Sequence, residues 1–323
     1  MSNETPAWAD QAAIEQAVGI LGQSARLNAP LGAITTSRVG GRAAISFTAN
    51  TAADLCRVGE ASQVAGVTVL IFGRGSNLLV ADRGFDGIAV FLGAAFSRID
   101  IDQRAATATA GAAVALPVLA RRCAAAGVGG LEWAVGVPGS VGGAVRMNAG
   151  GHGSDIASCL IDATIIDLSC DAPPSEPVTQ DPRALDLRYR HSGVSGTQVV
   201  TRARLQGRSD DPAAALERIA EIVRWRREHQ PGGQNAGSVF MNPPQDSAGA
   251  QIDQAGLRGL RIGSAEVSRM HANFIVSDPG GTAADVAAVM AEVRRRVADS
   301  AGIALQPEIR MVGFESSDSA SSV

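Results

Sequence analysis

The sequence predicts an α+β fold, and three observations support this. Short runs rich in β-branched residues, bounded by Gly or Asp, lie at residues 67–72 and 88–92 and predict strands. Apolar residues spaced three and four apart over residues 115–125 predict an amphipathic helix. The elements do not follow the strict β-α alternation of a Rossmann sheet, which favours α+β over α/β. The 323 residues, 46% of them apolar, suffice for two or three lobes with a sizeable core.

The elements expected in the first two thirds of the chain are a helix at 11–22, strands at 67–72 and 88–92, a helix at 115–125, and strands at 160–168 and 198–205. Leu116, Leu119 and Cys123 share one face of the helix at 115–125. Residues 1–30 are expected to be a lead-in segment. Residues 169–182 are rich in Asp, Pro and Ser and predict an exposed loop.

Two strong helices are expected in the last third. Asp211 followed by Pro212 predicts a helix start, because Asp is a good N-cap and Pro suits the first helical position. The apolar stripe of that helix is expected at Leu216, Ile219, Ala220 and Val223. The second helix is expected to be capped by Thr282 and to end at the arginines 294–296, whose charge complements the helix dipole. Its buried residues are expected to be Val286, Val289, Met290 and Val293.

The end of the chain predicts one more strand and a tail. Residues 303–313 are mostly apolar and are expected to form the final strand. Residues 315–323 are Ser-rich and too polar to bury a core, so they predict a disordered tail.

Charge and residue types argue against two classes of function. The net charge is −4 and no basic run is longer than three residues, which argues against a nucleic-acid-binding surface. The 4 cysteines contain no C-x-x-C pair and the 4 histidines show no zinc-binding spacing, so no metal site is expected. The chain has no lysine, so every cationic contact must come from arginine.

The same features predict a soluble cytoplasmic protein. Cysteines this sparse suit a reducing compartment. The N-terminal residues are acidic and lack the apolar region of a signal peptide. No apolar run reaches membrane-spanning length, so membrane insertion is not expected.

Residues 136–153 form the most informative segment of the chain. Glycine is unusually dense there, yet Val137, Val141, Val145 and Met147 interrupt it, so it is not a flexible linker. Glycine at this density lets the backbone approach a ligand, and free N–H groups can cradle phosphate. The segment fits neither the G-x-G-x-x-G turn nor the P-loop, which needs a lysine. It predicts a nucleotide or dinucleotide cofactor lying along the main chain.

Five further islands accompany this segment, in order along the chain. They are Thr35-Thr-Ser-Arg-Val-Gly-Gly41, Gly73-Arg-Gly-Ser-Asn-Leu-Leu79, Tyr189-Arg-His-Ser192, Ala236-Gly-Ser-Val-Phe-Met-Asn-Pro243 and His271-Ala-Asn-Phe-Ile-Val276. Together with residues 136–153, the set closely resembles the UDP-N-acetylenolpyruvoylglucosamine reductases, flavoenzymes of early peptidoglycan synthesis. The resemblance runs from about residue 30 to residue 314, in the order and approximate spacing of the family.

The resemblance implies a fold and a domain division. The fold is the two-lobed FAD-binding fold of vanillyl-alcohol oxidase and p-cresol methylhydroxylase, followed by a C-terminal α+β substrate domain. The FAD-binding domain is expected at 31–207, with lobes at about 31–97 and 98–207, and the substrate domain at 208–314.

Two glycine-rich segments are implied to wrap FAD. Read alone, residues 73–77 could equally be an ordinary turn after a strand, or could offer N–H and hydroxyl groups to a pyrophosphate. By resemblance they bind the cofactor, and Gly139, Ser140, Gly142 and Gly143 lie near its diphosphate and isoalloxazine. The residues implied to contact FAD are Gly73, Gly75, Ser76, Asn77, Leu78, Gly136, Pro138, Gly139, Ser140, Gly142 and Gly143.

Three residues are implied to be catalytic: Arg190, Ser238 and Glu308. Read alone, they are a surface arginine, a turn serine without a triad partner, and a carboxylate on the final strand. By resemblance, Arg190 clamps the substrate carboxylate and Ser238 gives a proton to the substrate carbon. Glu308 is expected close to Arg190, as an acid or charge stabiliser whose pKa is tuned by burial and that cation.

Substrate contacts are implied for Tyr189, Asn242 and His271. Asn273 is a weaker candidate beside them, since a polar pair at a strand start is the simpler interpretation. The sequence departs from the family at Met241, where a basic residue is common, and at Ser37, where a bulkier residue is usual. Many relatives use a lysine for the uridine diphosphate, so here an arginine must serve, with Arg226 or Arg227 as candidates.

The resemblance implies an NADPH-dependent FAD enzyme that reduces UDP-N-acetylglucosamine enolpyruvate to UDP-N-acetylmuramate. The partner is that small-molecule substrate, and a monomer is expected. Two alternatives remain open. One is a flavin oxidase of another alcohol, disfavoured because the islands after residue 208 are those of the reductase. The other is a non-catalytic sugar-nucleotide sensor, disfavoured because Arg190, Ser238 and Glu308 are all present.

Overall fold

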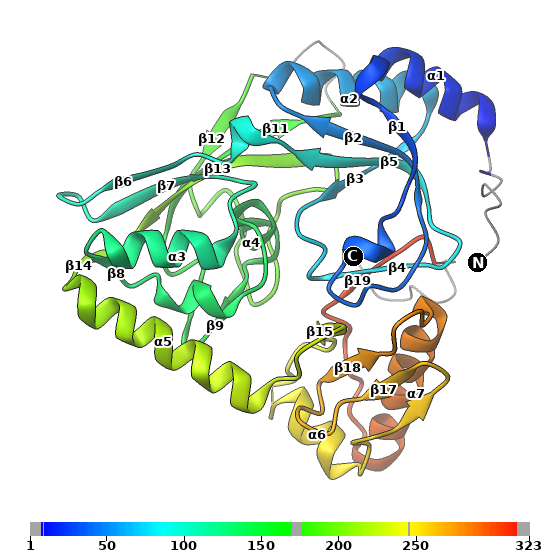
Figure 1. Ribbon diagram of the computed structural model, residues 1–323, viewed down its shortest axis with the longest axis vertical. Coiled ribbons are helices and arrows are strands. Elements are labelled where there is room, and N and C mark those ends of the chain that lie inside the picture. The colour runs from blue at the N-terminus through cyan, green and yellow to red at the C-terminus, as the bar shows by residue number, and fades with distance from the viewer. Residues whose placement is uncertain (1–7, 9, 170–175, 245, 315–323) are drawn as a thin grey trace.

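The computed structural model describes residues 8, 10–169, 176–244 and 246–314, and its architecture is α+β, as predicted. Three parts surround a central space (Figure 1). A mixed sheet with two helices lies at the top, an antiparallel sheet with three helices at the left, and a small sheet with two helices at the lower right. The predicted tail at 315–323 lies outside the described residues.

The first part is a four-stranded sheet covered on its outer face by α1 (Gln11–Leu21) and α2 (Ala52–Ala65). Its strands, in spatial order, are β1 (Arg26–Ala29), β2 (Ala43–Ala49), β5 (Phe85–Leu92) and β3 (Thr68–Phe72). Strands β2, β5 and β3 run parallel to one another, and β1 is antiparallel at one edge. A capping box between Thr51 and Asp54 starts α2 and satisfies the first free N–H groups of that helix.

The second part is a five-stranded antiparallel sheet. Its strands, in spatial order, are β12 (Val178–Gln180), β11 (Leu160–Asp167), β13 (Gln198–Gln206), β7 (Thr107–Gly111) and β6 (Ile99–Asp102). One core joins this sheet to α3 (Leu116–Ala125), α4 (Val141–Met147) and α5 (Pro212–His229). Helix α5 follows the predicted domain boundary at 208, yet Ala215 and Ile219 are buried in this core. The boundary itself stays a prediction.

The third part is a small antiparallel sheet packed against α6 (Ala248–Gln254) and α7 (Ala283–Ala301). Its strands, in spatial order, are β15 (Asn235–Ser238), β18 (Phe274–Ser277), β17 (Ala265–Val267) and β16 (Arg261–Ile262). Thr282 caps α7 by accepting from the Asp285 N–H, as predicted. The four residues predicted to be buried on α7 are all buried: Val286, Val289, Met290 and Val293.

The remaining elements are short. They are η1 (Gly22–Ser24), η2 (Gly32–Ile34), β4 (Leu78–Val80), η3 (Ala94–Phe96), β8 (Val128–Gly129), η4 (Glu132–Gly136), β9 (Gly150–Gly151), β10 (Ser154–Asp155), β14 (Arg208–Ser209) and β19 (Arg310–Val312). The most consequential pair is β4 with β19, which run parallel and return the end of the described chain to the first part. Asp82 adds a second tie, because its carboxylate accepts from the N–H groups of Ala283 and Ala284 at the start of α7.

Four expectations about elements are wrong in detail. Helix α7 continues past the arginines at 294–296 to Ala301, where Gly302 ends it with a φ of 68°. The final strand covers only Arg310–Val312 rather than 303–313. Strand β12 lies inside the loop predicted at 169–182, of which 170–175 are not described.

The predicted stripe of α5 is only half confirmed, because Ile219 is buried and Val223 packs against the core but the other two residues do not. Leu216 is 41% exposed and Ala220 is also exposed, whereas Ala215 and Ile219 face the core. Arg218 lies next to Ile219 and bonds the Glu132 carboxylate at 2.7 Å.

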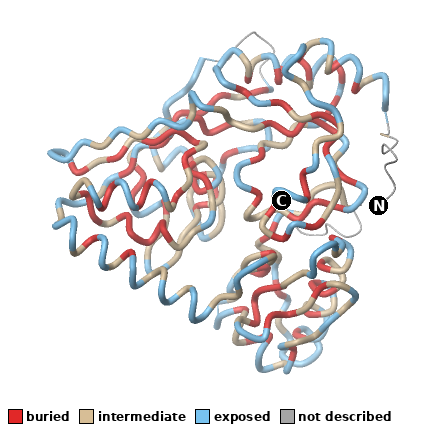
Figure 2. Tube along the Cα trace, viewed as in Figure 1, coloured by how far each residue is buried: buried red, intermediate tan, exposed pale blue. Residues whose placement is uncertain are grey.

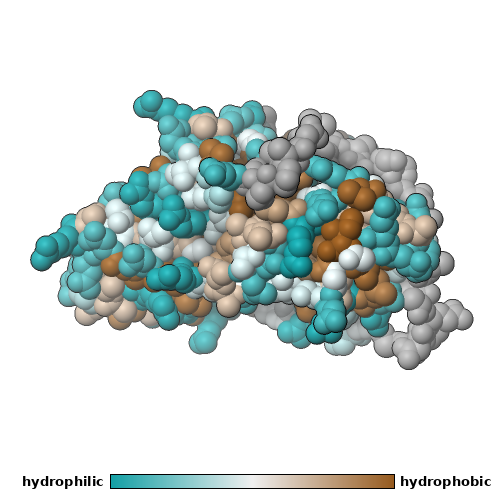
Figure 3. Space-filling model, turned by 90° about the horizontal axis from the view of Figure 1, so that it is seen from above, coloured by the Kyte–Doolittle hydropathy of each residue, from teal (hydrophilic) through white to brown (hydrophobic). Residues whose placement is uncertain are grey.

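The buried residues gather inside each part rather than in one continuous layer (Figure 2). Hydrophilic side chains cover much of the face seen from above in Figure 3, with hydrophobic atoms in smaller groups. Within the described part of the chain, no helix combines the length and the apolar character needed to cross a membrane.

Candidate active site

A cleft of about 850 Å³ lies where the three parts meet. This volume is in the range of sites for large organic ligands. Its walls come from segments far apart in the sequence: 34–38, 73–78, 136–152, 225–238 and 308–310. A smaller cavity of about 300 Å³ lies against β3 and shares Gly73, Ser140 and Gly143 with the cleft.

The structure brings the predicted cofactor residues together at these two cavities. Ten of them line the cleft: Gly73, Gly75, Ser76, Asn77, Leu78, Gly136, Pro138, Gly139, Ser140 and Gly143. The eleventh, Gly142, lines the smaller cavity. Their individual contacts with FAD stay predictions.

The glycines in this group serve two different purposes. A Cβ on Gly73 would lie 2.8 Å from the Ser140 hydroxyl, and a Cβ on Gly142 would lie 2.8 Å from the Ala112 Cβ. These two glycines let protein segments approach one another. A Cβ on Gly139 would meet nothing nearer than 3.7 Å, so the space beside Gly139 is open to the cleft. That open backbone fits a flat cofactor lying against it.

Besides Arg190 and the candidate Arg226, four further arginines line the cleft: Arg38, Arg74, Arg146 and Arg310. None of them forms an ion pair with any residue that the structure describes. Burial lowers the pKa of Arg146, and the nearby positive charge of Arg310 lowers it further. Neighbouring cations without a carboxylate favour an anionic ligand, and the diphosphate of FAD or of a sugar nucleotide has the required charge.

Sequence reasoning did not assign these four arginines. Their positions could have indicated a role in binding. Arg38, Arg74 and Arg146 lie in the segments 35–41, 73–79 and 136–153, and Arg310 lies two residues after Glu308. In a chain without lysine, such arginines are the only side chains that can neutralise two diphosphates.

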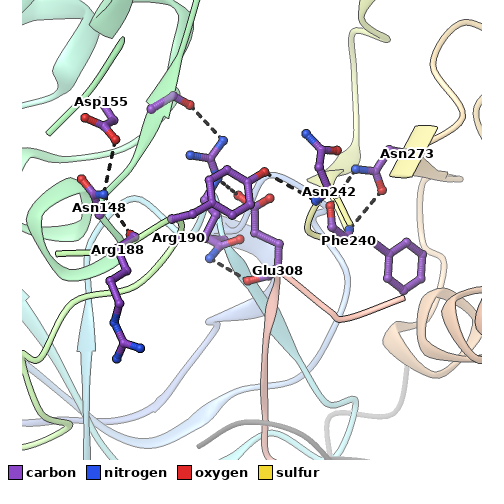
Figure 4. Close-up of polar contacts among 11 residues, drawn as sticks. Asn148, Asp155, Arg188, Arg190, Phe240, Asn242, Asn273 and Glu308 are labelled. Carbon is purple, nitrogen blue, oxygen red and sulfur yellow. Dashed lines mark hydrogen bonds and ion pairs between the residues drawn. The ribbon is translucent and has the colours of Figure 1, made fainter. Parts of the chain in front are cut away.

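Arg190 and Glu308 form an ion pair at the cleft (Figure 4). Arg190 Nε donates to Glu308 Oε1 at 2.8 Å, and Arg190 Nη2 donates to the Gly150 carbonyl at 3.0 Å. The two side chains are 20% and 16% exposed, respectively. The pair was expected from the resemblance, and the structure places both residues in the cleft wall.

A tight turn presents Arg190. Arg188 and His191 exchange both backbone hydrogen bonds at 3.0 Å, so Tyr189 and Arg190 occupy the turn between them. Arg190 adopts a φ of 55°, which is uncommon for a residue with a side chain. Asn148 holds the turn by donating to the Arg188 carbonyl at 2.9 Å, as Figure 4 shows. The turn is therefore fixed to the glycine-rich segment.

Glu308 lies just before β19 rather than on the final strand, which corrects the expectation. Its N–H donates to the Val239 carbonyl at 2.9 Å, and its carbonyl accepts from Asn77 Nδ2 at 3.1 Å. Burial raises the pKa of the Glu308 carboxyl, although the adjacent Arg190 opposes that rise. Glu308 therefore holds a proton more readily than an exposed glutamate does.

Ser238 ends β15 and lines the cleft. Within the described residues its hydroxyl makes no hydrogen bond to protein. Asn273 holds the segment just after it, because Oδ1 accepts from the Phe240 N–H at 3.0 Å and Nδ2 donates to the Phe240 carbonyl at 2.8 Å. Asn273 is only 4% exposed, so this clamp is part of the core beneath Ser238.

The three predicted substrate residues are not among those that line the cleft. Asn242 Oδ1 accepts from the Ala248 N–H at 3.0 Å, and its own N–H approaches the Tyr189 hydroxyl at 3.5 Å. His271 Nδ1 accepts from the Asn273 N–H at 3.3 Å, and burial lowers the pKa of His271. Direct contact of these three residues with substrate stays a prediction.

Of the two candidate arginines for the uridine diphosphate, Arg226 lines the cleft and Arg227 does not. Arg226 Nε donates to Gln230 Oε1 at 2.8 Å, and burial lowers the pKa of its guanidinium. Among the described residues, no three His, Cys, Asp or Glu side chains gather as a metal site would require.

Comparison with known proteins agrees with this geometry. A family model for the C-terminal domain of UDP-N-acetylenolpyruvoylglucosamine reductase matches residues 229–312, and an FAD binding domain model matches residues 43–169. The reductase of Heliobacterium modesticaldum is 41% identical over 88% of this chain and 89% of its own. The reductase of Acidiphilium cryptum is 40% identical over 96% of this chain and 97% of its own.

A solved structure gives the same result. The crystal structure of UDP-N-acetylenolpyruvylglucosamine reductase from Thermus caldophilus superimposes with a TM-score of 0.74 at 35% identity. The match covers 89% of this chain and 98% of that one. The chain therefore belongs to the UDP-N-acetylenolpyruvoylglucosamine reductase family, the FAD-dependent oxidoreductases of peptidoglycan precursor synthesis.

Proposed function

We propose that Arg190, Glu308 and Ser238 carry out the substrate half of the family reaction in this cleft. The reaction adds a hydride and a proton across the enolpyruvyl double bond of UDP-N-acetylglucosamine enolpyruvate and yields UDP-N-acetylmuramate. When bound, FAD would supply the hydride of this reaction, with NADPH as its source. The observation that carries the proposal is the Arg190–Glu308 pair in the same cleft wall as Ser238.

Arg190 binds the carboxylate of the substrate. One edge of its guanidinium already bonds Glu308, and the remaining donors can serve a second carboxylate. When hydride reaches the terminal carbon, negative charge spreads into that carboxylate. The fixed cation then stabilises the charge without reorganising, because Glu308 and the Gly150 carbonyl hold it in place.

Ser238 donates the proton to the carbon beside the carboxylate. Its hydroxyl has no hydrogen-bonding partner in the described protein, so it is available to a ligand. Glu308, whose pKa is raised by burial, is a suitable group to hold a proton and return it to Ser238 after Ser238 has protonated the carbon. Hydride and proton together saturate the double bond, so atoms and charge balance.

FAD would be held by the segments that line the two cavities. Gly139 leaves backbone open for the flat ring system, and the unpaired arginines Arg74 and Arg146 would neutralise the diphosphate. We also propose that residues 31–207 act as the FAD-binding domain and 208–314 as the substrate domain. The chain would work as a cytoplasmic monomer on its small-molecule substrate, without nucleic acid.

The first test is NADPH oxidation by the purified, FAD-loaded protein, with and without the enolpyruvyl sugar nucleotide. Rapid oxidation only in the presence of that nucleotide is expected. Oxidation that does not depend on it would favour the flavin oxidase, and no flavin reduction would favour the sensor.

The Ser238→Ala variant then tests the proton donor. Flavin reduction by NADPH should survive in this variant, whereas product formation should fall by about 10²–10⁴-fold, as expected for loss of a general acid. Activity equal to that of the wild type would remove Ser238 from the mechanism.

A further inference from the structure

A cluster of three aromatic rings lies at one wall of the cleft. None of the three belongs to a residue proposed to be catalytic. Trp225 lines the cleft near the C-terminal end of α5 and is 43% exposed. His229 stacks on the indole with ring centroids 4.7 Å apart and planes 11° apart. His152 approaches it edge to face at 5.2 Å, from the glycine-rich segment. Two rings thus hold an indole that still faces open space.

Packing of α5 does not explain this tryptophan. The helix is anchored by Ala215 and Ile219, and Trp225 is not part of the core that contains them. A large aromatic side chain left open within a ligand-sized cleft is an unusual use of apolar surface. It indicates a role in binding.

The adjacent residue supplies the complementary charge. Arg226 also lines the cleft and forms no ion pair with the described residues. Its guanidinium is fixed through Nε by Gln230 at 2.8 Å, which leaves the other donors free. An aromatic surface beside an unpaired, oriented guanidinium matches a planar base followed by a phosphate.

We infer that Trp225 and Arg226 form a subsite for the base and phosphate of a nucleotide that enters the cleft beside FAD. This inference rests on the proposed function, in which two such nucleotides take part: the uridine diphosphate sugar and NADPH. Both offer a planar heterocycle and a nearby phosphate. Trp225 and Arg226 would thus contact the nucleotide part of the ligand, whereas Arg190, Ser238 and Glu308 act on the reacting part.

The test measures the binding of UDP and of NADP⁺ separately to the FAD-loaded, oxidised protein by titration calorimetry. Trp225→Ala should raise the dissociation constant of one of these two nucleotides about tenfold, as expected for loss of one base–aromatic contact. Trp225→Phe should retain most of the affinity, because a phenyl ring can still stack.

Leu216→Ala is the matched control. Leu216 lies on the same helix, is 41% exposed and does not line the cleft. Its substitution should leave both dissociation constants unchanged. A loss confined to UDP assigns the subsite to the sugar nucleotide, and a loss confined to NADP⁺ assigns it to the cosubstrate.

Unchanged affinity for both nucleotides in Trp225→Ala would overturn the inference, and so would wild-type protein that binds neither. Failure of the proposed function has a different signature, namely wild-type protein that oxidises no NADPH when the enolpyruvyl sugar nucleotide is present. Fluorescence gives a second readout, since Trp133 is buried at 4% exposure, Trp8 is half-buried and does not line the cleft, and Trp225 is open. Quenching by the bound nucleotide should disappear in Trp225→Phe.

Discussion

Two alanine substitutions three positions apart in the sequence, Gly139→Ala and Gly142→Ala, should affect different properties of the protein. At Gly142 the new Cβ would lie 2.8 Å from the Ala112 Cβ and 3.3 Å from the Ala112 carbonyl oxygen. Neither of these atoms belongs to a flexible side chain, so the backbone must shift. Overpacking of this kind costs about 1–3 kcal/mol of unfolding free energy.

At Gly139 the new Cβ would meet no protein atom nearer than 3.7 Å. The fold of the FAD-free protein should therefore keep its stability, or gain slightly from a less flexible unfolded chain. The same methyl group would occupy space where the flavin is expected to lie. The dissociation constant of FAD should rise about tenfold or more, corresponding to at least about 1.4 kcal/mol.

The assay combines two measurements on each variant. Thermal unfolding of FAD-free protein reports the fold, and titration of FAD-free protein with FAD reports the cofactor site. Gly142→Ala should lower the unfolding temperature, whereas Gly139→Ala should leave it unchanged and weaken FAD binding. Wild-type FAD affinity in Gly139→Ala would refute the placement of the cofactor against this backbone.

Three further variants test other parts of the structure. Asn273→Ala leaves the Phe240 N–H and carbonyl without their partner, which should cost about 2–4 kcal/mol of unfolding free energy. In stopped-flow measurements this variant should slow flavin reoxidation by substrate but not flavin reduction by NADPH. Equal slowing of both steps would contradict a role for Asn273 in placing Ser238. Burial raises the pKa of Glu308, so the contribution of its carboxyl to stability is complete at low pH and is lost as pH rises through the folded-state pKa. Denaturant titrations should show the wild type losing stability relative to Glu308→Gln over that rise in pH. A pH-independent difference between the two proteins would contradict the raised pKa. Asp82→Ala removes the acceptor for two N–H groups at the start of α7 and should lower the unfolding free energy by about 1–2 kcal/mol in the same titration. Asp82→Asn should keep part of this stabilisation, because its side-chain oxygen can still accept.

Local signals in the sequence predicted the long elements well. The helix starting at Pro212 and the helix capped by Thr282 were found because N-caps and periodic apolar residues depend on neighbours in sequence. The end of α7 and the short strand β19 were misjudged, since both are decided by tertiary partners. Strand β19 exists because β4 pairs with it, and no local pattern reports that pairing.

The candidate site was predicted by resemblance rather than by residue chemistry. Read alone, Ser238 and Arg190 are ordinary surface residues, and only the fold places them in one cleft wall with Glu308. The unpaired arginines were missed for a related reason. Nothing in the sequence shows which arginines lack a carboxylate, because pairing depends on long-range packing. The pair formed by Arg218 and Glu132, 86 positions apart, illustrates this.

The pairing of β4 with β19 also constrains when this protein can become active. Asn77 and Glu308, which the pairing brings into hydrogen-bonding contact, are separated by 231 positions. Contacts this distant form late, because a long stretch of chain must be ordered before they gain any energy. Glu308 is also synthesised after Arg190 and Ser238. A nascent chain can therefore form the first two parts of the fold before Glu308 joins Arg190 at the cleft, so catalytic activity would report the last folding step.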